Sequence, residues 1–457
     1  MADTIAAVAT AMTASGIGII RISGPESREI AGKIYRSKGG KKRLENVPSH
    51  TIQYGFICDE DEIIDEVLVM VMDAPRSYTG ENTVEIDCHG GVLAMKRVLE
   101  TVIKYGARPA EPGEFTKRAF LNGRIDLSQA EAVIDVINAK NEYALKSSVS
   151  QLRGNIQRVI KEIRQGIIYQ IAYIESALDD PEHISIDGYG DTLKGEISLL
   201  KEKLNGLLNT VREGKLMKEG IKTVIVGKPN AGKSSLLNLL VGEERAIVTD
   251  IAGTTRDILE ETIVLHGISL RMIDTAGIRD TDDVVEKIGV KKAVENAKDA
   301  DLILYVVDSS VPLDENDKEI IELLKDKKAI VILNKMDLQQ QVTEEDLKAK
   351  TDHPVVAVSA KEEEGIENLE AQIKELFFEG DLSFNDEIYI TNMRHKAALE
   401  DAKRSLELVE NSIEMQMPED FFSIDLMNAY EALGSIIGES VGEDLLNEIF
   451  SKFCTGK

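Results

Sequence analysis

Eight consecutive residues, Gly227 to Ser234, have the types and spacing that bind a phosphate chain. They read Gly-Lys-Pro-Asn-Ala-Gly-Lys-Ser, the pattern G-x-x-x-x-G-K-[ST], between an apolar strand-like run and a helical Leu-Leu-Asn-Leu-Leu run. Such a turn surrounds a phosphate with backbone N–H groups, and the following helix N-terminus adds positive potential. Lys233 then reaches the β- and γ-phosphates, and the Ser234 hydroxyl binds Mg²⁺. The predicted triphosphate contacts are Asn230, Ala231, Gly232, Lys233, Ser234 and Ser235.

Three later segments follow in the order of a guanine-nucleotide site. In the first, Asp274 holds Mg²⁺ through water and the Gly277 N–H contacts the γ-phosphate. In the second, Asp337 accepts from guanine N1–H and N2–H₂, an arrangement that adenine lacks. The third begins at Ser359 and supports the base from behind. The GTP contacts predicted here are Asp274, Thr275, Ala276, Gly277, Asn334, Lys335, Asp337, Ser359, Ala360 and Lys361.

The segment between the phosphate loop and Asp274 supplies further oxygen donors. Thr255 is predicted to bind Mg²⁺, and Asn230 and Thr254 are candidate ligands for a monovalent cation. Ile278 stands where Ras-like GTPases have the glutamine that orients the attacking water. Either hydrolysis is absent or another polar group substitutes, and the candidates are Arg279, Asp282, Asp283 and Glu286. An arginine or a monovalent cation would neutralise charge between the phosphates.

These motifs need a parallel sheet, because each follows the end of a strand-like run. The predicted strands of this segment are Thr223 to Val226, Ser269 to Asp274, Leu302 to Asp308, Ala329 to Asn334 and Val355 to Ser359. The N-terminal segment is predicted to have strands over Gly16 to Ile22, Val67 to Met72 and Thr83 to Asp87, and a helix over Val92 to Tyr105. Helical regions are predicted over Ser128 to Leu178, Leu193 to Val211, Asn392 to Met415 and Ser423 to Phe450.

Helices on both sides of an α/β segment predict a discontinuous helical domain with another domain inserted into it. The predicted fold class is therefore multidomain, α/β and α. It comprises an α+β N-terminal domain (1–120), a first helical segment (121–218), an inserted Ras-like P-loop GTPase domain (219–380) and a second helical segment (381–457). Gly214 to Gly220 and Gly380 to Asp386 are the expected flexible junctions.

Composition limits the remaining possibilities. The 457 residues are 43% hydrophobic and 30% charged, which supports several globular cores and excludes a mainly disordered chain. Cysteines at 58, 88 and 454 predict no disulfide framework, and no apolar run reaches membrane-spanning length. We therefore expect a cytoplasmic protein with no membrane attachment. Most of the net charge of −27 lies in the second half, which a nucleic acid should avoid.

Motifs along the whole chain resemble the MnmE (TrmE) family of tRNA-modification GTPases. They include the phosphate loop, the Gly-Thr-Thr-Arg-Asp and Asp-Thr-Ala-Gly-Ile-Arg segments, and the C-terminal Cys454 to Lys457. The N-terminal pieces are Gly18 to Gly24, Ser77 to Glu81, His89 to Gly91, Pro112 to Phe115 and Ala119 to Asn122. Many GTPases share the nucleotide motifs, whereas this combination is specific to the family.

The resemblance implies that residues 1–120 form a domain that binds tetrahydrofolate and dimerises. It also implies that GTP hydrolysis is activated by K⁺, with Mg²⁺ bound. It implies a homodimer, and a heterotetramer with the FAD-dependent MnmG protein. Together these would add a carboxymethylaminomethyl (aminomethyl-type) group to C5 of the wobble uridine (position 34) of certain tRNAs. A tetrahydrofolate derivative, in the 5-formyl or 5,10-methylene form, would supply the one-carbon unit.

The resemblance also assigns site residues. Glu286 would be the catalytic residue that orients the water-positioning network. The K⁺ ligands would be the side chains of Asn230 and Thr254 and the carbonyls of Thr249 and Ile251, and the Mg²⁺ ligands would be Ser234 and Thr255. The GTP site would extend over Thr249, Asp250, Ile251, Ala252, Gly253, Thr254 and Thr255. The folate contacts would be Arg21, Glu85, Arg124 and Lys457, since a carboxylate accepts pterin N–H groups and cations suit the carboxylate tail.

Two other functions fit portions of the sequence. A regulatory GTPase of the ribosome-assembly kind would share the nucleotide motifs but leaves residues 1–120 and the C-terminal motif unexplained, and folate binding by the N-terminal segment would exclude it. A folate-dependent one-carbon transferase merely regulated by GTP would still modify tRNA after hydrolysis is abolished. Cys454 is left out of the catalytic residues, because a lone cysteine near a C-terminus is more often packed and inert.

Overall fold

The computed structural model describes residues 3–39, 43–243, 261–265, 267–273, 300–378 and 388–457. The chain forms two compact units. Unit 1 comprises Met1–Ile134, Gln151–Tyr189 and Arg404–Lys457, and unit 2 comprises Asp135–Ser150 and Gly190–Lys403. The four domain boundaries predicted above stay a prediction. Among the described residues, no helix has the length and apolar character needed to span a membrane.

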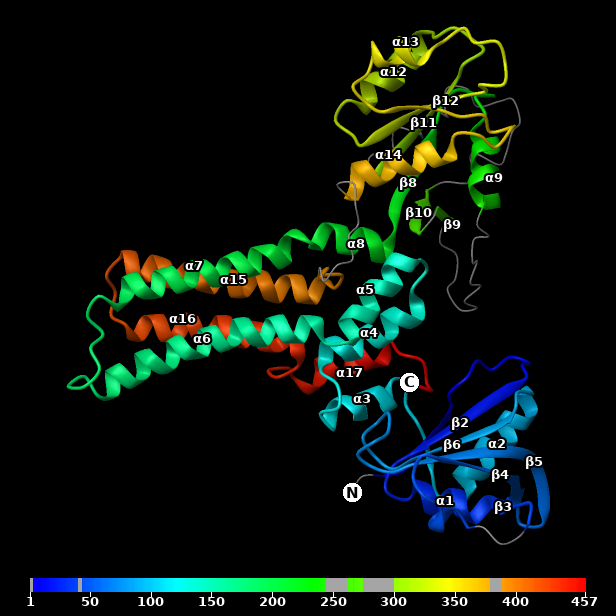
Figure 1. Cartoon of the computed structure of the whole chain (residues 1–457), viewed down its shortest axis with the longest axis vertical. Coiled ribbons are helices and arrows are strands. Elements are labelled where there is room, and N and C mark those ends of the chain that lie inside the picture. Colours follow the sequence, from blue (N-terminus) through cyan, green and yellow to red (C-terminus); the bar gives the residue numbers. More distant parts are fainter. Residues whose placement is uncertain (1–2, 40–42, 244–260, 266, 274–299, 379–387) are drawn as a thin grey trace. The chain divides into compact units, whose positions relative to one another are not determined.

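Unit 1 contains a seven-stranded sheet with the strand order β3-β4-β5-β6-β2-β1-β7. Figure 1 labels β2 to β6 of this sheet. Its neighbours pair antiparallel except β1 with β7. The strands are β1 (Ile5–Val8), β2 (Ile17–Ser23), β3 (Tyr35–Ser37), β4 (Thr51–Asp59), β5 (Glu62–Met72), β6 (Thr83–His89) and β7 (Arg108–Pro109). Alternate residues such as Ile20, Ile22 and Ile86 are fully buried against α1 (Ser27–Ile34) and α2 (Val92–Lys104). A short 3₁₀ helix, Leu44–Asn46, follows β3. The sheet therefore has one buried face and leaves Arg21 and Glu85 on the other.

The helices of unit 1 include α3 (Glu114–Leu121), α6 (Asn155–Asp179), α16 (Asp420–Ile437) and α17 (Glu443–Ser451). Figure 1 shows α6 and α16 side by side. The predicted helical region over Ser128 to Leu178 is confirmed, and it consists of three separate helices: α4 (Leu127–Asn138), α5 (Glu142–Leu152) and α6. Asn141 caps α5 by accepting the Ala144 N–H at 2.7 Å, and Gly154 takes a left-handed φ of 86° before α6. Gly438, with φ 88°, likewise separates α16 from α17.

Unit 2 contains a six-stranded sheet in the order β13-β12-β11-β8-β10-β9, parallel except for β9. The strands are β8 (Ile221–Val226), β9 (Glu261–Leu265), β10 (Ile268–Met272), β11 (Leu302–Asp308), β12 (Ala329–Asn334) and β13 (Val355–Ala357). Helices α9 (Lys233–Glu243) and α14 (Ile366–Phe378) pack with one set of strand side chains, and α12 (Glu315–Leu324) and α13 (Glu344–Lys348) with the alternate set. Burial on both faces explains the nearly continuous apolar strands.

The other helices of the described residues are α7 (Tyr189–Asn209), α8 (Val211–Glu219) and α15 (Met393–Glu414). The predicted flexible junction at Gly214 to Gly220 is wrong, because most of it lies inside α8. A Cβ at Gly214 would lie 2.5 Å from the Ile390 carbonyl oxygen, so this glycine allows a close backbone approach instead. The second predicted junction, Gly380 to Asp386, lies outside the described residues.

Candidate functional site

The phosphate loop leaves β8 at Val226 and enters α9 at Lys233, as the motif predicts. Three of its residues have positive φ: Gly227 at 152°, Asn230 at 60° and Gly232 at 98°. A Cβ at Gly232 would lie 2.1 Å from Asn334 Nδ2, and one at Gly227 would lie 2.4 Å from the Val306 carbonyl oxygen. Only glycine fits at both positions, so the backbone forms a cradle that side chains would fill.

Lys233 lies over this loop. Its Nζ donates to the carbonyl oxygens of Gly227 at 2.8 Å and Lys228 at 2.7 Å. Burial lowers the pKa of the Lys233 ammonium below its ordinary value. The Lys233 ammonium therefore lies against the backbone of the loop that the motif predicts to bind phosphates. This position is expected for a lysine that reaches the β- and γ-phosphates.

The base-binding end is joined to the phosphate loop through Asn334. Its Nδ2 donates to the Ala231 carbonyl at 2.9 Å, and its Oδ1 accepts from the Ala360 N–H at 3.2 Å. Asp337 Oδ1 accepts from Ser359 Oγ at 3.0 Å, which fixes the carboxylate proposed to read guanine. The chain thus brings together three motifs that lie far apart in the sequence.

Two lysines flank this end. Lys335 has a φ of 63° and places its Nζ 2.5 Å from Asp308 Oδ2. Lys361 Nζ lies 3.8 Å from Asp337 Oδ2. The sequence predicts both lysines as GTP contacts, and both lie against carboxylates at the carboxyl ends of β11 and β12, where open α/β sheets bind ligands.

Several predicted nucleotide and ion contacts lie outside the described residues. They are Thr249, Asp250, Ile251, Ala252, Gly253, Thr254, Thr255, Asp274, Thr275, Ala276, Gly277 and Glu286. Ile278, Arg279, Asp282 and Asp283 also lie outside them. Of the predicted ion ligands, Asn230 and Ser234 are described.

A second cluster lies in unit 1 on the sheet face opposite its core. Arg21 on β2 and Glu85 on β6 are register partners, and Arg21 Nε lies 2.6 Å from Glu85 Oε1. Both side chains are largely buried, at 13% and 16% exposure. A paired charge of this kind holds the guanidinium in a fixed orientation.

Three cations surround the ring of Tyr78. Arg21 Cζ lies 5.2 Å from the ring centroid, Arg124 Cζ 5.0 Å and Lys457 Nζ 5.9 Å. The Tyr78 hydroxyl hydrogen-bonds Thr116 Oγ1 at 2.8 Å. We call this set, together with Glu85, the Tyr78 cluster. It gathers all four predicted folate contacts around an aromatic residue that was not among them, although it lies within the Ser77 to Glu81 motif.

The C-terminus reaches this cluster because two glycines allow close contact. Gly113 N–H donates to the Cys454 carbonyl at 3.3 Å, and a Cβ at Gly456 would lie 2.4 Å from the Val8 carbonyl oxygen. Arg21 donates to the Gly456 carbonyl at 3.4 Å. Burial, and then the charge of Arg21, lower the pKa of the Lys457 ammonium. The last residue is thus held within a cationic site that suits an anionic ligand.

Comparison with known proteins covers the chain from end to end. A family model described as the MnmE helical domain matches residues 127–454, and one described as the GTP-binding protein TrmE N-terminus matches residues 4–124. The tRNA modification GTPase MnmE of Lachnoclostridium phytofermentans is 62% identical over 455 residues, which is 100% of this chain and 99% of the relative. That of Clostridioides difficile is 50% identical over 460 residues, again 100% and 99%.

Among solved structures, the G domain of the T. maritima FeoB iron transporter is 28% identical to this chain. The match covers 34% of this chain and 98% of that domain, with a TM-score of 0.26.

Proposed function

Since this chain belongs to the MnmE family of tRNA-modification GTPases, we propose that it couples GTP hydrolysis to the modification of C5 of a wobble uridine in tRNA. The group added to C5 would be a carboxymethylaminomethyl group, which is an aminomethyl-type substituent. The partners would be a second copy of the chain and the FAD-dependent MnmG protein, in a heterotetramer. The site of action would be the cytoplasm.

The nucleotide half of the proposal is supported by the phosphate loop and Asn334. The cradle around Gly227 and Gly232 fits a phosphate chain, and Asp337 fits the two adjacent donors of guanine. Ser234 and Thr255 would hold Mg²⁺, and Asn230 with Thr249, Ile251 and Thr254 would hold K⁺. These ions would supply positive charge where negative charge develops as the γ-phosphate leaves.

The K⁺ assignment has a direct test in the rate of hydrolysis. Because Ile278 cannot orient water, the proposal needs a cation between the phosphates and Glu286 in the water network. Hydrolysis should therefore be much faster in K⁺ than in Na⁺ at equal ionic strength. Asn230→Ala should abolish that difference, and Glu286→Ala should lower the rate by about 10²–10³-fold. Equal rates in the two salts would overturn the K⁺ assignment.

The one-carbon half is supported by the Tyr78 cluster. A tetrahydrofolate derivative has a planar ring with N–H groups and an anionic tail. The donor set fits it, since Glu85 supplies a carboxylate, Tyr78 an aromatic face, and Arg21, Arg124 and Lys457 supply cations. The 5-formyl or 5,10-methylene form would carry the carbon that is transferred.

One observation carries the whole proposal: a single chain holds both a GTP-type cradle and the Tyr78 cluster. A regulatory GTPase alone gives no reason for the second site. The test is mass spectrometry of tRNA nucleosides from cells that lack the protein. The modified wobble uridine should be missing and its unmodified form should accumulate. An unchanged wobble nucleoside would overturn the proposal.

A further inference from the structure

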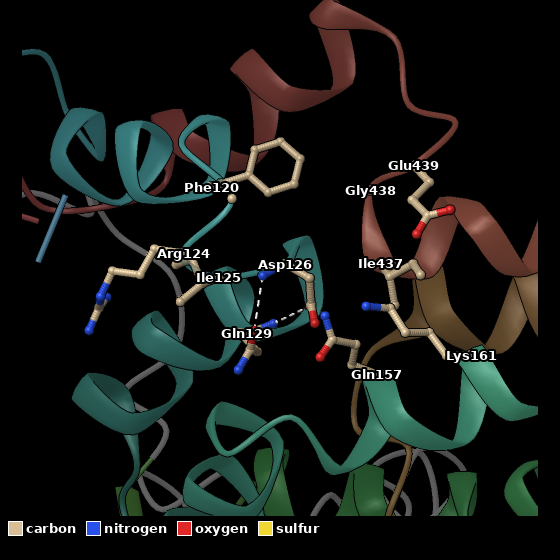
Figure 2. Close-up of a pocket in the computed structure, with 11 residues that line it drawn as sticks. Phe120, Arg124, Ile125, Asp126, Gln129, Gln157, Lys161, Ile437, Gly438 and Glu439 are labelled. Carbon is tan, nitrogen blue, oxygen red and sulfur yellow. Dashed lines mark hydrogen bonds between the residues drawn. The ribbon is translucent and has the colours of Figure 1, made fainter. Parts of the chain in front are cut away.

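Unit 1 contains a pocket of about 450 Å³ that neither the nucleotide site nor the Tyr78 cluster accounts for. It lies where the link between α3 and α4 meets α6 and the end of α16 (Figure 2). Its polar lining includes Arg124, Asp126, Gln129, Gln157, Lys161 and Glu439. This volume is within the range of small-molecule sites.

Asp126 makes the pocket chemically specific. The residue is only 8% exposed. Its Oδ1 accepts from Ser128 Oγ at 2.6 Å and from Gln129 N–H at 2.9 Å, while Gln129 Oε1 accepts from the Asp126 N–H at 3.0 Å. This reciprocal capping box accounts for one carboxylate oxygen. The other, Oδ2, is buried and has no hydrogen-bond partner among the described residues. A buried acceptor without a partner is costly, so a ligand donor would be favoured there.

Two side chains from α6 complete the recognition set. In Figure 2 the Gln157 amide and the Lys161 ammonium point towards the Asp126 carboxylate. Burial raises the pKa of Asp126 and the charge of nearby Lys161 opposes that rise, but Lys161 does not hydrogen-bond Oδ2. A ligand would reach Oδ2 by displacing the Gln157 side chain, whose amide could then pair with the ligand. The fitting ligand therefore donates one hydrogen bond to Oδ2 and offers adjacent acceptors to Lys161 and Gln157.

We propose that this pocket binds a uracil base through its imide edge, with N3–H donating to Asp126 Oδ2 and the neighbouring carbonyls accepting from Lys161 and Gln157. A single free oxygen favours a ring with one N–H between two carbonyls. Guanine and pterin present two adjacent donors, and Asp126 Oδ1, which already accepts from both Ser128 Oγ and the Gln129 N–H, has no lone pair left for the second donor. Cytosine presents an acceptor at N3, which Asp126 repels.

The surroundings agree with a base that belongs to an RNA chain. Lys161 is exposed, and its three N–H donors can serve a uracil carbonyl and a neighbouring phosphate together, whereas Asp126 is buried on the wall. Arg124 lines this pocket and also lies over the Tyr78 ring, so the pocket adjoins the site proposed for the one-carbon donor. The inference rests on the proposed function and places its target base beside that donor.

The test uses the full-length protein and three anticodon stem-loop RNAs that carry uridine, N3-methyluridine or cytidine at the wobble position. Replacing uridine by either of the other two should weaken binding about tenfold or more, the loss expected for one charge-assisted hydrogen bond. Asp126→Asn keeps an oxygen for the capping box but turns the free acceptor into a donor. It should bind the uridine and N3-methyluridine RNAs equally. Lys161→Gln should weaken binding of the uridine RNA. Arg158→Gln lies on the same helix but outside the pocket lining, and it should leave the ratio of the affinities for the uridine and N3-methyluridine RNAs nearly unchanged.

A second measurement locates the base. A 4-thiouridine at the wobble position should photo-crosslink to residues of the pocket lining, such as Gln157 or Lys161. Crosslinks confined to other segments, or equal affinity of the wild-type protein for all three RNAs, would overturn the inference. If Asp126→Asn cells still contain the modified wobble uridine, the pocket assignment fails while the proposed function stands. If deletion of the whole protein leaves the nucleoside unchanged, the proposed function fails.

Discussion

The phosphate loop in unit 2 and the Tyr78 cluster in unit 1 are built in opposite ways. The phosphate loop uses backbone groups from consecutive residues, and its geometry depends on positive φ at Gly227, Asn230 and Gly232. The Tyr78 cluster uses side chains from separate segments, including the last residue of the chain. A contiguous sequence motif indicates a site built from local backbone groups. A cluster of side chains from separate segments forms only after the strands and the C-terminus have packed together.

This difference predicts opposite sensitivities to mutation. GTP binding by the backbone cradle should be lost when a single methyl group is added, whereas loss of the exposed Asn230 side chain should remove K⁺ activation and leave GTP binding largely intact. The Tyr78 cluster should lose affinity in small steps as each ring or cation is removed. Because the two sites lie in separate units, each variant should affect only its own ligand.

The largest effect is expected for Gly232→Ala. Its φ of 98° is strained for alanine, and the new Cβ would meet Asn334 Nδ2 at 2.1 Å. GTP affinity should fall by about 100-fold or more, measured by titration with a fluorescent GTP analogue. Gly242→Ala in α9, where a Cβ meets nothing within 4 Å, is the matched control and should bind normally. Normal binding by Gly232→Ala would contradict the cradle.

Asp337→Asn tests the base-reading end of the same site. Loss of two charge-assisted acceptors should weaken GTP binding by about 2–4 kcal/mol, because the substituted amide would present a donor to guanine. Calorimetric titration with GTP measures the change, and binding of the tetrahydrofolate derivative should stay unaltered. A variant that binds GTP as tightly as the parent would remove the guanine assignment from this strand end.

Tyr78→Ala tests the side-chain cluster. Tyr78→Ala removes the ring that three cations contact, and it should weaken binding of 5-formyltetrahydrofolate by about tenfold. Tyr78→Phe keeps the ring, so its affinity for 5-formyltetrahydrofolate should fall less. Tyr54 carries one lysine, Lys38, over its ring at 5.0 Å in the same sheet, so Tyr54→Ala is the control. Equal affinities for Tyr78→Ala and the parent would show that the cluster is structural only.

The smallest effect is a pH dependence from Lys457. A lysine is charged below its pKa, and burial together with Arg21 lowers that pKa here. Affinity for the anionic folate derivative should therefore fall, by a few-fold, as the pH rises through this lowered pKa. Lys457→Arg stays charged and should abolish the decline in titrations at increasing pH. A parent protein whose affinity does not change over the alkaline range would argue against contact with Lys457.

Much of the nucleotide site could be predicted because its motifs are local. β12 spans Ala329–Asn334 as predicted, and Asn334 joins the loop to the base-binding end. The breaks at Asn141, Gly154 and Gly438 were missed, although asparagine and glycine are residue types that commonly begin or end helices. Tyr78 was missed as a site residue, since nothing in its sequence neighbourhood shows that three distant cations converge on it.

The central claim is that both sites of this chain serve one modification of the wobble uridine. Cells lacking the protein should be complemented in turn with the parent, Asp337→Asn, Tyr78→Ala and the control Tyr54→Ala, and their tRNA nucleosides quantified by mass spectrometry. We predict that the parent and Tyr54→Ala restore the modified uridine fully, while Asp337→Asn and Tyr78→Ala each restore much less at equal protein levels. Full restoration by both of the site variants would contradict the claim.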